Sequence, residues 1–180
     1  MQMNNTETQF DKLEKNLLAL STRMPDLPFN EVMLCRLTMH LGREMATMLD
    51  QQIRPFGLAE AEFRVLTTLF SQPDGVAHPS DLCARTAQSP ANMSRICDAL
   101  VSRDLITRVM SAHDRRRMVL RITERGEELV RQLLPTMFGP LRDLYSGISE
   151  EDQRHLISHL KGLYARMLEA PKLEAVERAE

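Results

Sequence analysis

Three consecutive arginines, Arg115, Arg116 and Arg117, stand in the stretch SAHDRRRMVLRITERG (residues 111–126). An arginine guanidinium is always charged and presents a planar fork of N–H donors, which suits paired contacts with phosphate oxygens. A chain with a formal net charge of −2 does not need this cluster to stay in solution. The alternative is a solvated loop tip, but the cluster favours a surface that binds a polyanion.

Charge is unevenly distributed along the 180 residues. Residues 85–125 hold nine arginines and four acidic residues, a local charge of +5, whereas the rest of the chain carries −7. A basic segment inside an acidic protein marks a nucleic-acid-binding face more clearly than the charge of the whole chain does.

A predicted helix just before the cluster carries a second set of polar side chains. Ser89 followed by Pro90 is typical of a helix start, with serine as the N-cap and proline at the first helical position. Apolar residues at helical spacing then predict a buried face formed by Met93, Ile96, Cys97 and Leu100. The opposite face holds Asn92, Ser94 and Arg95 among small residues, so this helix could approach a flat partner closely. For Arg95, an ion pair with Asp98 is the alternative to contact with a partner.

Two short strands are expected to hold the arginine cluster in position. Alternating patterns predict strands at about residues 105–110 and 117–122, with residues 111–116 as the loop between them. Two further helices are predicted before Ser89, at about residues 59–70 and 81–86. The resulting order of three helices followed by a hairpin is that of a winged helix-turn-helix.

The remaining segments are predicted to be helical. They cover about residues 6–20, 30–54, 59–70 and 81–86, then a helix from a Thr123 cap to about residue 145 that is interrupted at Pro135 and Pro140, and a last helix from Ser149 to about residue 168. The predicted fold class is mainly α with a small two- or three-stranded β wing, a winged helix-turn-helix with a helical dimerisation region. We expect three parts: an N-terminal extension and first dimerisation helix (1–54), a DNA-binding lobe (55–123), and C-terminal helices that complete the dimerisation region (124–180).

The long helices carry more apolar surface than one small lobe can cover, which predicts a homodimer. No apolar run is long enough to span a membrane and the first residues do not resemble a signal peptide, so a cytoplasmic protein without a membrane partner is expected. Three cysteines without CxxC spacing predict neither a disulfide framework nor a zinc finger.

The hairpin motif resembles the wing signature of the MarR family of transcriptional regulators, D-x-R-x-x-x-[LV]-x-[LI]-T-x-x-G. The matching residues are Asp114, Arg116, Leu120, Ile122, Thr123 and Gly126. The order of elements also agrees over residues 29–170. The extension before residue 29 and the stretch PFNEVMLCRLTMHL are similar to the EmrR/MprA subgroup of multidrug-efflux repressors.

This resemblance implies a homodimer on a pseudo-palindromic double-stranded DNA operator, with each recognition helix in a major groove and each wing in the neighbouring minor groove. Arg116 is then expected in the minor groove, with Asp114 steadying the loop. We expect Asn92, Ser94 and Arg95 to contact bases, and Ser89, Arg103, Arg115 and Arg117 to contact phosphates.

The family also places a small-molecule effector between the long first helix and the DNA-binding lobe. Arg36 and His40, one turn apart, are candidates to contact a phenolic or lipophilic acid; the alternative is a paired arginine and an interface histidine. The resemblance to multidrug-efflux repressors, together with release by such an effector, implies that the protein controls multidrug efflux or a response to aromatic compounds. Cys35 is interpreted as a buried thiol, with redox sensing, as in the peroxide-sensing branch of the family, as the alternative mechanism.

An enzyme is not indicated, because the chain has no recognisable catalytic triad order, paired-carboxylate site or phosphate loop. No catalytic residues and no cofactor are expected. His155 and His159 have metal-ligand spacing, but without a third ligand facing them we interpret them as a surface pair rather than a metal site.

Overall fold

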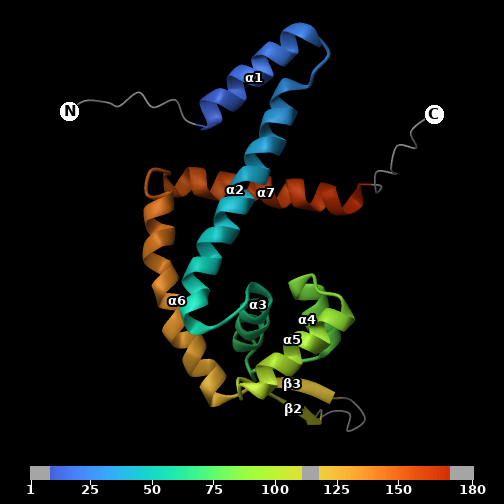
Figure 1. Cartoon of the computed structure of the whole chain (residues 1–180), viewed down its shortest axis with the longest axis vertical. Coiled ribbons are helices and arrows are strands. Elements are labelled where there is room, and N and C mark those ends of the chain that lie inside the picture. Colours follow the sequence, from blue (N-terminus) through green and yellow to red (C-terminus); the bar gives the residue numbers. More distant parts are fainter. Residues whose placement is uncertain (1–8, 111–117, 171–180) are drawn as a thin grey trace. The chain divides into compact units, whose positions relative to one another are not determined.

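The computed structural model describes residues 9–110 and 118–170, in two compact units divided between Leu133 and Leu134 (Figure 1). Helix α6 belongs to both units. The helices are α1 (Gln9–Arg23), α2 (Phe29–Ile53), the 3-10 helix η1 (Arg54–Phe56), α3 (Glu60–Phe70), α4 (Pro79–Thr86), α5 (Pro90–Ser102), α6 (Glu124–Tyr145) and α7 (Glu150–Glu169); the strands are β1 (Val76–Ala77), β2 (Ile106–Met110) and β3 (Met118–Ile122). This order confirms the predicted mainly α fold class.

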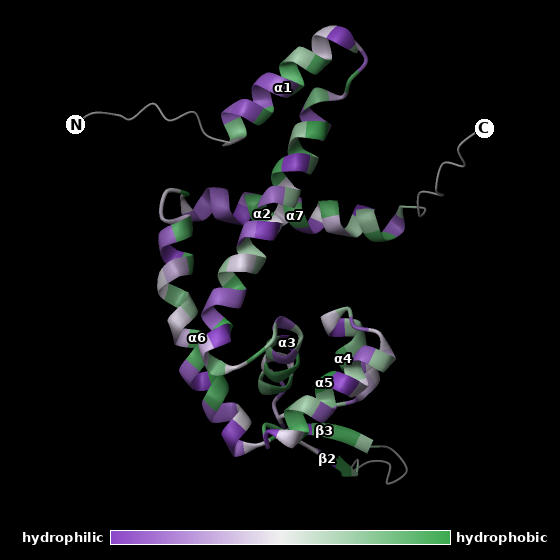
Figure 2. Cartoon of the chain, in the orientation of Figure 1, coloured by the Kyte–Doolittle hydropathy of each residue, from purple (hydrophilic) through white to green (hydrophobic). Residues whose placement is uncertain are grey.

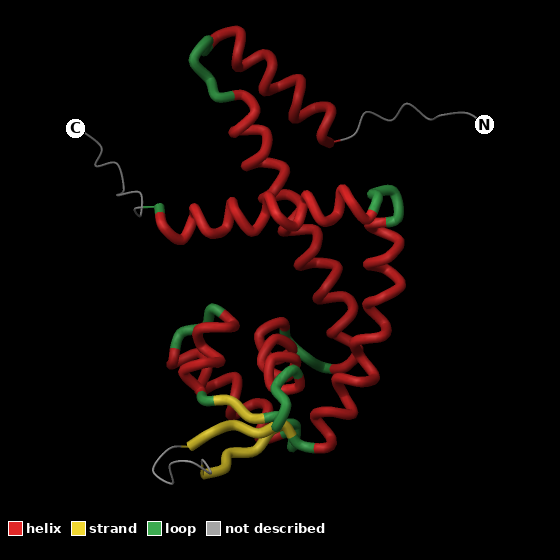
Figure 3. The backbone as a smooth tube through the Cα atoms, turned by 180° about the vertical axis from the view of Figure 1, so that it is seen from behind, coloured by secondary structure: helices red, strands yellow, loops and turns green. Residues whose placement is uncertain are grey.

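The strands form one antiparallel sheet in the order β1–β3–β2, and Figure 3 shows the three side by side. β2 pairs with β3 from Ile106 opposite Ile122 to Met110 opposite Met118, so the predicted hairpin is confirmed. β1 pairs Val76 with Arg121 inside a stretch predicted to be a loop. A strand of two residues is too short to show an alternating pattern in the sequence, and this segment is a strand only because it pairs with β3.

The core of the first unit is built by α3, α4, α5 and the sheet. Its side chains are almost fully buried and apolar, and they include Val65, Leu66, Leu69, Leu82, Met93, Leu100, Ile106 and Leu120. The predicted buried face of α5 is confirmed, since Met93, Ile96, Cys97 and Leu100 are all buried. This packing fixes which face of α5 is left for solvent or a partner.

The helix α1 packs on α2. Leu17 of α1 is 1% exposed, and the ring of Phe10 meets that of His40 on α2 edge to face, with centroids 6.0 Å apart. Large apolar side chains on α2 nevertheless remain at the surface, and apolar residues recur along this helix in Figure 2. They include Leu34, Met39 and Leu41.

The helix α6 runs without a break through Pro135 and Pro140, so the predicted interruptions are wrong. A proline in a helix cannot donate to the carbonyl of the residue four positions earlier. Those residues are Arg131 and Thr136, and both are exposed, so water can reach this side of the helix.

The second unit continues into α7, whose apolar side chains are exposed in the single chain; they include Leu156, Ile157, Leu160, Leu163, Tyr164 and Met167. None of the helices in the described residues is long and apolar enough to cross a membrane.

A compact junction joins α5, both long strands and α6. The Leu105 amide donates to the carbonyl of Leu100 (3.0 Å), and the Thr123 amide donates to the carbonyl of Leu105 (3.1 Å). The Thr123 hydroxyl donates to the carbonyl of Asp104 (2.8 Å) and accepts from the Gly126 amide (3.0 Å), which confirms Thr123 as the cap of α6. A β-carbon at Gly126 would overlap the Leu105 carbonyl and approach Ile122 to 2.8 Å, so only glycine fits there.

Replacing Gly126 by alanine should therefore destabilise the fold by about 2–3 kcal/mol or more, because the clash is with backbone that cannot turn away. The matched control is Gly42→Ala in the middle of α2, where nothing lies within 4 Å of an added β-carbon and no proline directly follows. That change should stabilise by roughly 0.5–1 kcal/mol through helix propensity. Urea denaturation followed by circular dichroism measures both, and equal effects of the two substitutions would contradict the junction.

Candidate nucleic-acid interface

Two helices joined by a tight turn form the centre of the candidate interface. α4 ends at Thr86 and is followed by Ala87, whose φ of 54° is in the left-handed region, and α5 begins at Pro90, two residues after Gln88. The Ser89 hydroxyl accepts a hydrogen bond from the Asn92 amide (3.3 Å), and Pro90 occupies the first turn. The predicted N-cap is confirmed, and the arrangement is a helix-turn-helix with α5 as its second helix.

The solvent-facing side of α5 holds the predicted polar residues. Ser94 and Arg95 are exposed, whereas Asn92 is half-buried. The side-chain amide of Asn92 donates to Gln88 Oε1 at 2.5 Å, which holds the carboxamide near the start of the helix. The structure thus brings Ser89, Asn92, Ser94 and Arg95 together on one surface.

Arg95 does not form the alternative ion pair with Asp98 within the part of the chain that the structure describes. Asp98 is instead paired with Arg108 of β2, with 2.5 Å between Nη2 and Oδ1. The guanidinium of Arg95 is left at the surface. It is therefore available to an external acceptor.

Arg103 is held by the protein. Its guanidinium donates to the backbone carbonyls of Gly57 (2.7 Å) and Phe56 (3.1 Å) and lies 3.7 Å from the Glu62 carboxylate. Glu62 also accepts from the Ala59 amide (2.9 Å) at the start of α3. These bonds tie the end of α5 to the segment between α2 and α3, so we leave Arg103 out of the contacts proposed below.

The tip of the wing, with Asp114, Arg115, Arg116 and Arg117, lies outside the described residues. The described base of the hairpin carries two further arginines that were not among the predicted site residues. Arg108 pairs with Asp98, and Arg121 donates to the backbone carbonyl of Asp74 (3.1 Å). Their place in an alternating strand pattern is the one signal that could have directed attention to them.

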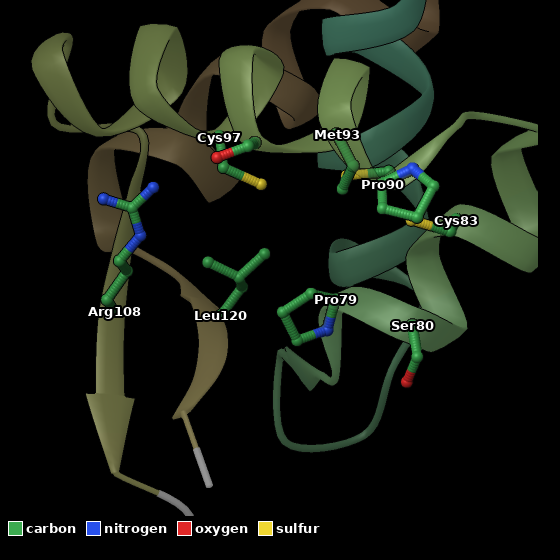
Figure 4. Close-up of a pocket in the computed structure, with 9 residues that line it drawn as sticks. Pro79, Ser80, Cys83, Pro90, Met93, Cys97, Arg108 and Leu120 are labelled. Carbon is green, nitrogen blue, oxygen red and sulfur yellow. The ribbon is translucent and has the colours of Figure 1, made fainter.

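A cavity of about 580 Å³ lies between α4, α5 and the hairpin (Figure 4). Its wall is mainly apolar, with Pro79, Met93 and Leu120, and the thiols of Cys83 and Cys97 and the guanidinium of Arg108 also line it. Burial raises the pKa of the Cys97 thiol above its ordinary value, against the opposing effect of the nearby Arg108 charge. This cavity was not predicted from the sequence, because its residues come from separate elements.

The residues predicted to contact an effector lie elsewhere on α2. Arg36 is exposed, His40 is covered on one edge by Phe10, and neither lines the cavity just described. The buried environment predicted for Cys35 is wrong for the single chain, where this thiol is exposed and Cys97 is the buried one. The reason is that α1 covers a different side of α2.

Comparison with known proteins identifies the chain. The MarR family profile matches residues 56–117, from the last residue of η1 to the residue before β3. The transcriptional repressor MprA of Escherichia coli K12 is 32% identical over 161 residues, which covers 89% of this chain and 92% of MprA. The chain belongs to the MarR family.

Solved structures of MarR-family regulators have the same fold. AbsC of Streptomyces coelicolor is 25% identical and superposes with a TM-score of 0.69 over 77% of this chain and 96% of AbsC. A C80S mutant of Escherichia coli MarR complexed with operator DNA is 22% identical, with a TM-score of 0.65 over 76% of this chain and 97% of that protein. As a member of the MarR family, the protein is a DNA-binding transcriptional regulator.

Replacing Arg103 by alanine should lower the free energy of unfolding by about 1–2 kcal/mol, because it leaves two backbone carbonyls without their donor. Binding to DNA, measured by fluorescence anisotropy at a temperature where the variant is folded, should keep the wild-type dependence on salt. A salt slope lower by about one unit would instead identify Arg103 as a phosphate contact.

Proposed function

We propose that this regulator is a repressor that binds a pseudo-palindromic DNA operator as a homodimer, with α5 of each protomer in a major groove and the wing in the adjacent minor groove. The observation that carries the proposal is the solvent-facing side of α5. It presents an arginine that has no ion-pair partner among the described residues, together with small polar residues, on a helix whose other face is fixed by the core. Exposed side chains at the start of such a helix can reach base edges.

Each polar residue of this surface suits a definite part of the DNA. Arg95 can bind the O6 and N7 atoms of guanine through two parallel hydrogen bonds, and Asn92 and Ser94 can contact neighbouring bases. Ser89 stands at the N-terminus of α5, where backbone N–H groups and the helix dipole favour a phosphate. In the wing, we assign Arg116 to the minor groove, Asp114 to steadying the loop, and Arg115 and Arg117 to phosphates.

Apolar surface on the long helices supports the homodimer. Leu34, Met39 and Leu41 on α2, and the apolar stripe of α7, are each exposed in the single chain. A second copy related by a two-fold axis would remove such patches from water. The same symmetry would present two α5 helices to half-sites about 34 Å apart, one turn of DNA.

The cavity between α4, α5 and the hairpin supports release by a small aromatic or lipophilic acid. Apolar walls with one cationic group, here Arg108 among the described lining residues, are typical of sites for such ligands. A ligand bound there would contact the recognition helix and the wing strand together, and would shift the dimer population if it bound one arrangement more tightly. Arg36 and His40 remain the sequence-based candidates for a second contact. Similarity to MprA, a transcriptional repressor, supports repression. The resemblance of the N-terminal stretch to multidrug-efflux repressors favours control of multidrug efflux or of a response to aromatic compounds.

Arg95→Ala should weaken binding to the operator about tenfold or more and should abolish discrimination at one base pair in each half-site. Arg116→Ala should also weaken binding, with its loss greatest at operators whose flanks are rich in A·T pairs. Arg154→Ala on α7 serves as the control, since this exposed arginine belongs to the other unit. Anisotropy titrations with single-base operator variants measure all three. Equal loss by Arg95→Ala on every sequence would contradict a base contact.

We expect hydroxybenzoic acids to raise the melting temperature of the wild-type protein. Cys83→Phe should obstruct the cavity and abolish this rise, while operator binding without ligand is retained. Arg36→Ala is the comparison variant, because Arg36 does not line the cavity. Differential scanning fluorimetry across a hydroxybenzoate panel provides the measurement. A shift that persists in Cys83→Phe and disappears in Arg36→Ala would move the effector site to α2.

A further inference from the structure

The ion pair between Arg108 and Asp98 links the recognition helix to the wing strand. Arg108 Nη2 lies 2.5 Å from Asp98 Oδ1, although the two residues are on different elements. In Figure 4 the guanidinium of Arg108 extends from β2 toward α5. Both side chains are partly exposed, at 42% and 60%, so the pair sits at the surface next to the face assigned to DNA.

Asp98 has a second arginine within its reach. Arg95 stands three residues earlier on the same helix, and residues at this spacing are neighbours on a helix surface. Elsewhere in the chain, arginines pair with an acid four residues earlier, as Arg64 does with Glu60 at 2.8 Å and Arg131 with Glu127 at 2.6 Å. Asp98 instead stands three residues after Arg95, the other spacing at which helix side chains meet. Among the described residues Arg95 forms no such pair, and its potential partner is already occupied by Arg108.

We propose that Arg108 is a positioning residue for sequence recognition: by pairing with Asp98, it prevents Asp98 from binding Arg95 and so leaves Arg95 free for a base. Arg108 acts through Asp98 and does not itself contact the operator. The pair also offsets a negative charge that would otherwise face the phosphates. This inference rests on the proposed function, in which Arg95 reads a base.

Two other roles of Arg108 predict different effects of its loss. If Arg108 contacted a phosphate directly, its loss would reduce binding whether or not Asp98 was present. If the pair were only structural, its loss would change stability and leave base discrimination intact. Relief of charge repulsion would restore affinity on every sequence when Asp98 is removed, but only competition for Arg95 predicts that removing Asp98 also restores discrimination at the base pair that Arg95 reads.

The test is a double-mutant cycle with Arg108→Gln, Asp98→Asn and the two combined. Arg108→Gln should bind the operator about tenfold more weakly and lose discrimination at the base pair that Arg95→Ala affects. The double variant should recover affinity to within about twofold of wild type and should regain discrimination at that base pair, and Asp98→Asn alone should bind at least as tightly as wild type. Arg64→Gln is the control, since it breaks an ion pair on α3 that does not involve α5.

A double variant as weak as Arg108→Gln, or an Arg108→Gln variant with wild-type affinity and discrimination, would overturn the inference. Circular dichroism melting of each variant ensures that affinities are compared between folded proteins. Arg95→Ala, measured in parallel, distinguishes failure of this inference from failure of the proposed base contact. If Arg95→Ala is impaired and Arg108→Gln is not, the inference alone fails, whereas wild-type binding by Arg95→Ala overturns the proposed base contact as well.

Discussion

The carbonyl group of Leu105 is the point on which the DNA-binding unit depends. It accepts from the Thr123 amide and lies against Gly126, while the amide of the same residue bonds to the end of α5. The end of the recognition helix, both strands of the hairpin and the start of α6 are therefore joined by backbone contacts over a few residues. Backbone bonds of this kind leave little freedom in the angle between helix and wing, so the two are presented to DNA as one body.

For the proposed DNA contact, the interactions that each arginine makes within the protein matter more than the number of arginines. Arg103 and Arg121 donate to backbone carbonyls, and Arg108 neutralises Asp98. Of these three arginines and Arg95, only Arg95 has no such partner among the described residues, and it is the one that we propose to contact a base. An effector acid in the neighbouring cavity would lie beside Arg108, so ligand binding and base recognition would draw on the same positive charge.

The sequence predicted most of the elements because their signals are local. Ser89 and Thr123 stand before their helices as caps, and the apolar stripe of α5 gives its buried face directly. Contacts between distant residues could not be predicted: Arg103 finds its carbonyl partners 46 and 47 residues away, and β1 exists only through β3. The candidate DNA face was likewise predictable from residue types, whereas the state of each charge, and the cavity, required the folded arrangement.

The central claim is that α5 reads the major groove while the wing occupies the minor groove. Dimethyl sulfate tests it directly, because it methylates guanine at N7 in the major groove and adenine at N3 in the minor groove. On operator DNA bound by the wild-type protein, the account predicts protected guanine N7 positions in two half-sites about one helical turn apart, flanked by protected adenine N3 positions. Protection of adenine N3 alone, or a single protected site without two-fold symmetry, would contradict it.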